Sequence, residues 1–280
     1  MSALVALYTA HARLVDQIGI NALLALSLTV SLQAGQLALA QAGFMGIAAY
    51  VAAIAALDGH WPLAMCVAAA VAVTTAVAAL LALPVARLRG IFLAIATIGF
   101  GEIVRVVANN LTVTGGAEGL SAIPNDATTP LIYGALAVVA IALWLLRATR
   151  FHLAAVLTRE DERAARGVGV NVGAVRFGSL ALGGAIAGLA GALYAHSSFF
   201  ITPADFGFGR MEQILVWCVI GGVTSPLGAV LGAVVLSALP EAIRALADFR
   251  DVTNGLILLA VIVLAPSGFA GLWRRRATQR

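Results

Sequence analysis

The 280-residue sequence contains no lysine, and only 11% of its residues are charged. A soluble domain carries roughly 25% charged residues, so this chain has too few charges to cover a surface that faces water. Hydrophobic residues make up 61% of it. We therefore predict an all-α fold, a polytopic transmembrane helical bundle with about eight to ten membrane segments, some of them short or broken.

The absence of lysine excludes two kinds of chemistry. A Walker A phosphate-binding loop needs a lysine before its Ser or Thr, and a Schiff base needs a lysine amine. We therefore expect no ATP hydrolysis by this chain. The net charge of +4 comes from arginines, which membrane proteins collect at the cytoplasmic edge, so nucleic acid is not an expected partner.

Cysteine and histidine are also scarce. Cys66 and Cys218 lie in apolar runs and are expected to be small buried hydrophobes. The four histidines show no HxxxH or HExxH spacing, so no metal site is predicted. No Ser-His-acid arrangement falls on one face of the membrane, and no chain of titratable residues crosses it. We expect no catalytic residue, no cofactor and no enzymatic activity.

The apolar runs define a single transmembrane domain over residues 1–280. Predicted membrane segments lie at residues 18–32, 37–57, 63–83, 91–108, 131–146 and 177–196, in two short pieces within 211–239, and from 255 to 265. The arginine cluster at 274–276 favours a cytoplasmic C-terminus, which places the N-terminus outside. Loops 109–129, 197–210 and 241–254 are then external, and loop 147–176 is cytoplasmic.

Loop 147–176 is the one long polar insert. Thr158, followed three residues later by Asp161, resembles a capping box that begins a short helix. Glu162 and Arg166 are an i,i+4 pair, and Gly167 should end the helix. One interpretation is a surface helix displayed for another protein, and the other is a solvated loop that joins two spans.

Two further features allow two readings each. The polar interruption at 33–36, followed by Gln41 and Gly43, is either a broken helix beside a translocation path or a tight turn at the cytoplasmic surface. Glu102 and Arg105, one turn apart in a predicted span, are either part of a gate or a salt bridge that fixes packing.

Five stretches resemble the LivM-type permeases of bacterial branched-chain amino acid ABC importers. They are AGQLALAQAGFMGIAAY at 34–50, LRGIFLAIATIGFGEIVR at 88–105, TGGAEGLS at 114–121, REDERAARGVGVN at 159–171 and GGVTSPLGAVLG at 221–232. Gln41 stands where the family usually has histidine, and Thr224 replaces a common glycine.

The resemblance implies a multi-pass subunit of the bacterial inner membrane. Its expected partners are the lipid bilayer, two ABC ATPase subunits, a second related permease and a periplasmic solute-binding protein. The implied substrate is a branched-chain or related amino acid, and relatives also carry urea, amides or aromatic acids. A self-sufficient secondary transporter or channel is the alternative class.

The resemblance also assigns candidate sites. The ATPase-coupling helix would comprise Arg159, Glu160, Asp161, Glu162, Arg163, Ala164, Ala165, Gly167 and Asn171. The translocation path would include Gln36, Gln41, Gly43, Thr97, Gly99, Gly101, Glu102 and Arg105. The loop facing the binding protein would contain Thr114, Gly115 and Gly116.

Overall fold

The computed structural model describes residues 2–85, 87–222 and 225–242, and every regular element in this part of the chain is a helix. The elements are α1 (Ser2–Gln33), α2 (Gln41–Leu57), α3 (Leu63–Val85), α4 (Gly90–Asn110), the 3-10 helix η1 (Gly116–Glu118), α5 (Thr129–Leu146), α6 (Arg150–Glu160), α7 (Glu162–Gly167), α8 (Val172–Ser198), the 3-10 helix η2 (Pro203–Phe206), α9 (Phe208–Gly221) and α10 (Pro226–Ala242). The predicted all-α membrane bundle is confirmed.

Five helices in the described part are long and apolar enough to cross a membrane. They are the stretch Ala12–Gln33 of α1, together with α3, α4, α5 and α8. The bent pair formed by α9 and α10 counts as a sixth if it is one span, and α2 is a shorter apolar helix. Apolar segments of the described chain therefore include full spans and short helices, as the sequence predicted.

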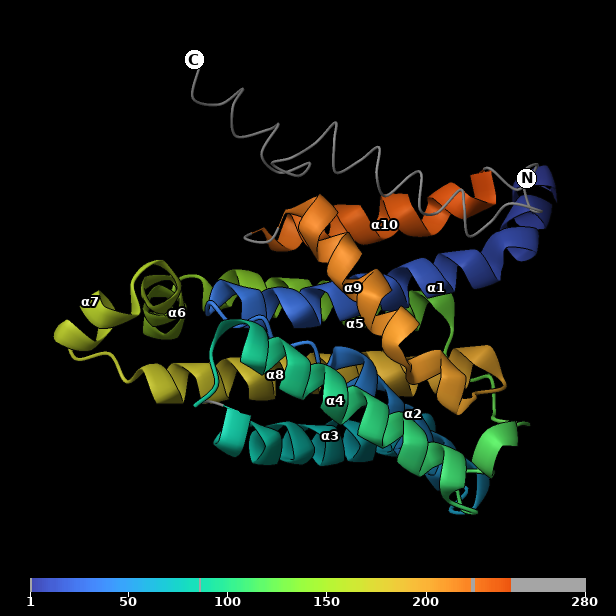
Figure 1. Cartoon of the computed structure of the whole chain (residues 1–280). Helices are drawn as coiled ribbons and strands as arrows, with labels where there is room; N and C mark the ends of the chain where they lie inside the picture. Colours follow the sequence, from blue (N-terminus) through green and yellow to red (C-terminus); the bar gives the residue numbers. More distant parts are fainter. Residues whose placement is uncertain (1, 86, 223–224, 243–280) are drawn as a thin grey trace.

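The centre of the bundle is α8, which packs against α1, α2 and α3 (Figure 1). Small residues bring these helices close together. A Cβ on Gly191 would lie 2.2 Å from the backbone oxygen of Met45, and one on Gly184 would lie 2.3 Å from the Cβ of Ala78. Close approach of backbones through small residues is how transmembrane helices gain packing energy.

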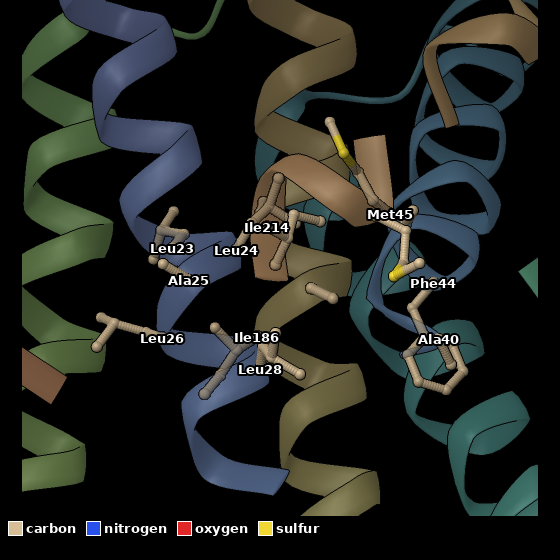
Figure 2. Packing of buried hydrophobic residues seen from close by; sticks show 14 of the residues in the cluster. Leu23, Leu24, Ala25, Leu26, Leu28, Ala40, Phe44, Met45, Ile186 and Ile214 are labelled. Atoms are coloured by element: carbon tan, nitrogen blue, oxygen red, sulfur yellow. The ribbon is translucent and has the colours of Figure 1, made fainter. Parts of the chain in front are cut away.

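The core around α8 is apolar and continuous. Leu24 and Leu28 of α1 lie beside Ile214 of α9 and Ile186 of α8 (Figure 2). Phe44 and Met45 of α2 are completely buried in the same cluster. This core holds the short helices α2 and α9 inside the bundle.

The two ends of the bundle differ. The end that carries α6 and α7, which we call the α7 end, protrudes beyond the ends of α1 and α8 (Figure 1). At the opposite end, which we call the loop end, Leu120 and Ile201 form an antiparallel bridge with N–O distances of 3.0 Å. Loops 109–129 and 197–210 therefore lie at the same end of the bundle. The sequence predicts this arrangement, because it places both loops on one side of the membrane.

Some boundaries differ from the prediction. Pro84 does not end α3, which continues to Val85. The membrane helix predicted to start at residue 177 starts at Val172, because Asn171 caps it through its side chain. The two pieces predicted within 211–239 are present as α9 and α10, bent by 120° at their junction. Residues 243–280, with the last predicted span, most of loop 241–254 and the cluster at 274–276, lie outside the described residues.

Candidate functional site

The α7 end is organised by the carboxylate of Glu162. Its Oε1 lies 3.0 Å from Nη2 of Arg89 and 2.7 Å from Nη2 of Arg166, and its Oε2 lies 3.1 Å from Nη2 of Arg176. The Glu162 side chain is only 18% exposed. One acidic group thereby joins α7 to the start of α4 and to α8.

The predicted single coupling helix is wrong in one respect, because the chain forms two helices that meet at Asp161. Thr158 does not cap a helix; it lies within α6 and donates to the oxygen of Ala154. Asp161 is the true N-cap of α7, since its Oδ1 accepts hydrogen bonds from the backbone of Arg163 and Ala164. Such a cap satisfies amides that a helix start leaves free.

The remaining predicted coupling residues are divided between these elements. Arg159 and Glu160 form an ion pair at the end of α6. Ala165 is the buried residue of α7, and Gly167 is the last residue of that helix. Asn171 caps α8, because its Oδ1 accepts a hydrogen bond from the amide of Ala174. The predicted stretch is therefore a helix–cap–helix unit that leads into α8.

The outward face of this unit is open. Arg163 and Ala164 are exposed, and none of the ion pairs among described residues includes Arg163. Two apolar side chains of the same helix–cap–helix unit are also exposed, Leu153 at 70% and Val168 at 72%. Burial lowers the pKa of His152 on α6, and Arg147 and Arg159 lower it further, so that imidazole is uncharged at neutral pH.

The same unit contacts the break between α1 and α2. A Cβ on Gly35 would lie 3.0 Å from Cα of Arg159, and φ at Gly35 is +71°. Ala34 packs in a small cluster with Ala155 of α6 and Val175 of α8. The break therefore lies directly under α6.

The break is non-helical backbone inside the bundle. Its amide at Leu39 donates to Oγ1 of Thr97 in α4 at 2.8 Å. Gln36 and Gln41 are buried, and Oε1 of Gln36 and both amide atoms of Gln41 have no partner among the described residues. The helix is interrupted here by a turn at Ala34–Gly35 followed by non-helical chain up to α2, and a translocation path beside it stays a prediction.

Four of the predicted path residues meet where α2 crosses α4, and one lies elsewhere. Gly43 faces Gly101 so closely that a Cβ on Gly43 would lie 3.0 Å from Cα of Gly101, and Thr97 lies one turn earlier on α4 beside Leu39. Gln41 begins α2 next to this crossing. Gly99 is exposed on another face of α4, and nothing would contact a Cβ there.

Glu102 and Arg105 form the salt bridge that one reading predicted, with Nε and Oε2 2.7 Å apart. The other oxygen of Glu102 accepts a hydrogen bond from the backbone amide of Phe208 at 2.9 Å. The pair therefore fastens α4 to the first residue of α9. A small cavity beside it, of about 10 Å³, is lined by residues that include Leu39, Gly101 and Met211. It has room for about one water molecule.

Loop residues Thr114, Gly115 and Gly116 have a structural role of their own. Oγ1 of Thr114 donates to the backbone of Ala108 or Leu111, and both glycines have positive φ. A Cβ on Gly115 would lie 2.0 Å from the oxygen of Gly119. The motif shapes the turn at the loop end.

Sequence reasoning did not find the partners of Glu162 across the fold. These partners are Arg89 and Arg176. No sequence signal joins them to Glu162, since the three residues are brought together by the packing of α4, α7 and α8. Among the described residues, no group of three His, Cys, Asp or Glu could hold a metal ion.

Comparison with known proteins decides the family. The family described as branched-chain amino acid transport system / permease component matches residues 12–266. The chain belongs to this permease family. LivM, the high-affinity branched-chain amino acid transport system permease protein, is 30% identical over 294 residues in both Salmonella typhimurium and Escherichia coli K12, covering 92% of this chain and 67% of LivM. No solved structure matches.

A second kind of relative matches a shorter part. LsrC of Escherichia coli O9:H4, an autoinducer 2 import system permease protein, is 34% identical over 168 residues, covering 54% of this chain and 49% of LsrC. These relatives are thus transport permeases named for different substrates. The family assignment makes this chain a multi-pass transport permease.

Proposed function

We propose that this chain is the membrane-spanning permease subunit of an ATP-binding-cassette importer in the bacterial inner membrane, carrying branched-chain or related amino acids. The match to LivM supports amino acids, because it extends over 92% of the chain, whereas the match to LsrC extends over 54%. Partner subunits supply the ATP hydrolysis: two ABC ATPases, with a second related permease and a periplasmic solute-binding protein completing the importer.

The observation that carries the proposal is the attachment of the α6–α7 unit. Its outer face is open for a protein partner, with Arg163, Leu153 and Val168 exposed. Its inner face is tied by Glu162 to the starts of α4 and α8. Movement of an ATPase docked on α7 would therefore displace these two helices directly.

The path runs along the crossing of α2 and α4 in this proposal. Gln36, Gln41, Gly43, Thr97 and Gly101 border the broken segment there, and Glu102 with Arg105 fastens its outer end to α9. Non-helical backbone at membrane depth is tolerated where it lines a cavity or is buried in protein, and broken helices in transporters mark substrate sites. Widening of the small cavity beside Gly101 is the motion that ATP would drive. At the outer end, Thr114, Gly115 and Gly116 would lie in the loop that faces the binding protein.

Charge reversal at Arg163 tests the docking role, because this residue is exposed and has no ion-pair partner among described residues. We expect Arg163→Glu to reduce ATP-driven leucine uptake by about tenfold or more in proteoliposomes of the complete importer, since a charge facing a partner surface becomes repulsive. Arg13→Glu, an exposed arginine of α1 far from α7, is the matched control. Normal uptake by Arg163→Glu would contradict docking at α7.

Reconstitution also distinguishes an ATP-driven importer subunit from a self-sufficient secondary transporter or channel. The chain purified alone should give no uptake, and uptake should appear only when the ATPases, the second permease and the binding protein are added with ATP. Uptake by the chain alone would support a secondary transporter or channel. Competition of leucine uptake by isoleucine, valine, aromatic amino acids, amides and urea then identifies the substrate class.

A further inference from the structure

The first turn of α9 contains an arginine that forms no ion pair among the described residues, although Asp205 acts on its charge from a distance. Nε and Nη2 of Arg210 are buried and have no hydrogen-bond partner among the described residues, although part of the side chain stays exposed. None of the ion pairs among those residues includes it. Arg105, the other arginine at this level, has Glu102 as its partner.

Aromatic rings surround the guanidinium of Arg210. Its Cζ lies 5.5 Å from the ring centre of Tyr194 and 5.8 Å from that of Trp217. Tyr194 packs edge-on against Phe206, which packs edge-on against Tyr50. The hydroxyl of Tyr50 is also buried without a partner among the described residues. Ring faces stabilise the positive charge, but they leave the N–H donors of the guanidinium unused.

The acidic residue in the adjoining turn is engaged elsewhere. Oδ2 of Asp205 accepts hydrogen bonds from the backbone amide and the hydroxyl of Thr202, which fixes it as part of the capping of η2. It therefore does not compensate Arg210 by direct contact. A buried ionised group without hydrogen bonds is costly and rare, and in membrane proteins it marks a functional position.

The two unpartnered nitrogens define the shape of the missing group. Nε and Nη2 lie on one edge of the planar guanidinium, and their N–H groups form the fork that binds both oxygens of a carboxylate. The ring of Phe206 borders both this arginine cluster and the small cavity beside Gly101. A solute that enters when the cavity opens would meet the fork at the start of α9.

We propose that Arg210 is a binding residue for the carboxylate of the transported solute, with the Tyr50 hydroxyl as a second donor nearby. The inference rests on the proposed function, and it narrows the substrate class to solutes that carry a carboxylate. Urea and neutral amides would lack the group that the fork binds.

The test uses the complete importer in nanodiscs without its binding protein, so that only the membrane site is measured. Binding of radiolabelled leucine is followed by competition with unlabelled leucine and with leucinamide, which lacks the carboxylate. We expect Arg210→Met to weaken leucine binding by about tenfold or more and to leave leucinamide unchanged, as expected for loss of a charge-assisted pair. Arg210→Lys keeps the charge but not the fork of N–H donors, so its leucine affinity should lie between those of the wild type and Arg210→Met. Arg13→Met is the control.

The outcomes against the proposal are distinct. Equal weakening of leucine and leucinamide binding in Arg210→Met, or no weakening of leucine binding, would overturn it. If Arg210→Met fails to assemble, the leucine-to-leucinamide ratio of Arg210→Lys decides. ATP-driven leucine uptake is measured separately: its absence in the wild-type importer refutes the proposed function, whereas its presence with an unchanged Arg210→Met refutes only the role of Arg210.

Discussion

Glu162 of α7 lies 3.1 Å from Arg176 of α8 through Oε2 and Nη2, and its other oxygen lies 3.0 Å from Arg89 at the start of α4. Arg89 precedes the first residue of α4 and is its N-cap. Helix α7 is thus connected through one carboxylate to the start of α4 and to the central helix α8. In the proposed coupling, Glu162 would transmit movement to these helices, and the exposed Arg163 beside it would contact the ATPase.

The first prediction concerns the charge of Glu162. Glu162→Gln should lower both the melting temperature and the ATP-coupled uptake, because three arginines would lose their negatively charged partner. A hydrogen bond to a charged group is worth about 1.5–3 kcal/mol. Each kcal/mol corresponds to about 2–4 °C in a chain of this size. Melting in nanodiscs and uptake in proteoliposomes measure the two effects.

Glu160→Gln is the matched control for Glu162→Gln. Glu160 is 65% exposed and pairs only with the adjacent Arg159, and exposed pairs contribute little. Its melting temperature should stay within about 1–2 °C of the wild type. Equal effects of the two variants would show that Glu162 does not connect the helices.

The second prediction concerns Thr97, the acceptor for the amide of Leu39. Thr97→Val keeps the side-chain shape but leaves this amide of the break unsatisfied, which costs about 1–3 kcal/mol. Thr97→Ser keeps the hydroxyl and should melt close to the wild type. Hydrogen exchange at residues 36–40, measured by mass spectrometry, should rise in Thr97→Val. Unchanged hydrogen exchange would mean that another group accepts the hydrogen bond from the Leu39 amide.

The third prediction separates the two contacts of Glu102. Glu102 and Arg105 side chains are about a third exposed, so their mutual attraction is worth about 1 kcal/mol or less. The hydrogen bond from Phe208 N to Glu102 is the contact that joins two elements. Arg105→Ala should therefore destabilise less than Glu102→Ala in melting experiments. A larger effect of Arg105→Ala would show that the packing of Arg105 on Gly207 is the stronger contact.

The sequence was sufficient for the spans and for the type of fold, because apolar length and the spacing of arginines determine both. It also identified the pair Glu162–Arg166 and the pair Glu102–Arg105, since both lie within one helix, where spacing fixes contact. The sequence placed the N-cap of the polar helix at Thr158, whereas the structure has it at Asp161. Either residue type can cap a helix, and only the fold shows that Thr158 lies within α6.

Contacts between helices could not be read from the sequence. Arg89 and Arg176 meet Glu162 only after α4, α7 and α8 pack. The exposure of Gly99 was also hidden, because a glycine in an apolar run looks the same whether it lies at a crossing or faces outward. The unpaired state of Arg210 depends on where α8 and η2 place Tyr194 and Asp205.

The last prediction compares glycines that the sequence does not distinguish. A Cβ at Gly191 would lie 2.2 Å from the backbone oxygen of Met45, which cannot move without α2, whereas nothing lies within 4 Å of a Cβ at Gly99. Gly191→Ala should force α8 and α2 apart and destabilise the chain by about 1–3 kcal/mol or more, a fall of several degrees in melting temperature. Gly99→Ala should leave the melting temperature unchanged or raise it slightly, because alanine favours the helix by about 1 kcal/mol over glycine. Melting of both variants in the same nanodiscs decides between them. Similar stability of the two would show that α8 and α2 do not cross at Gly191 in the membrane.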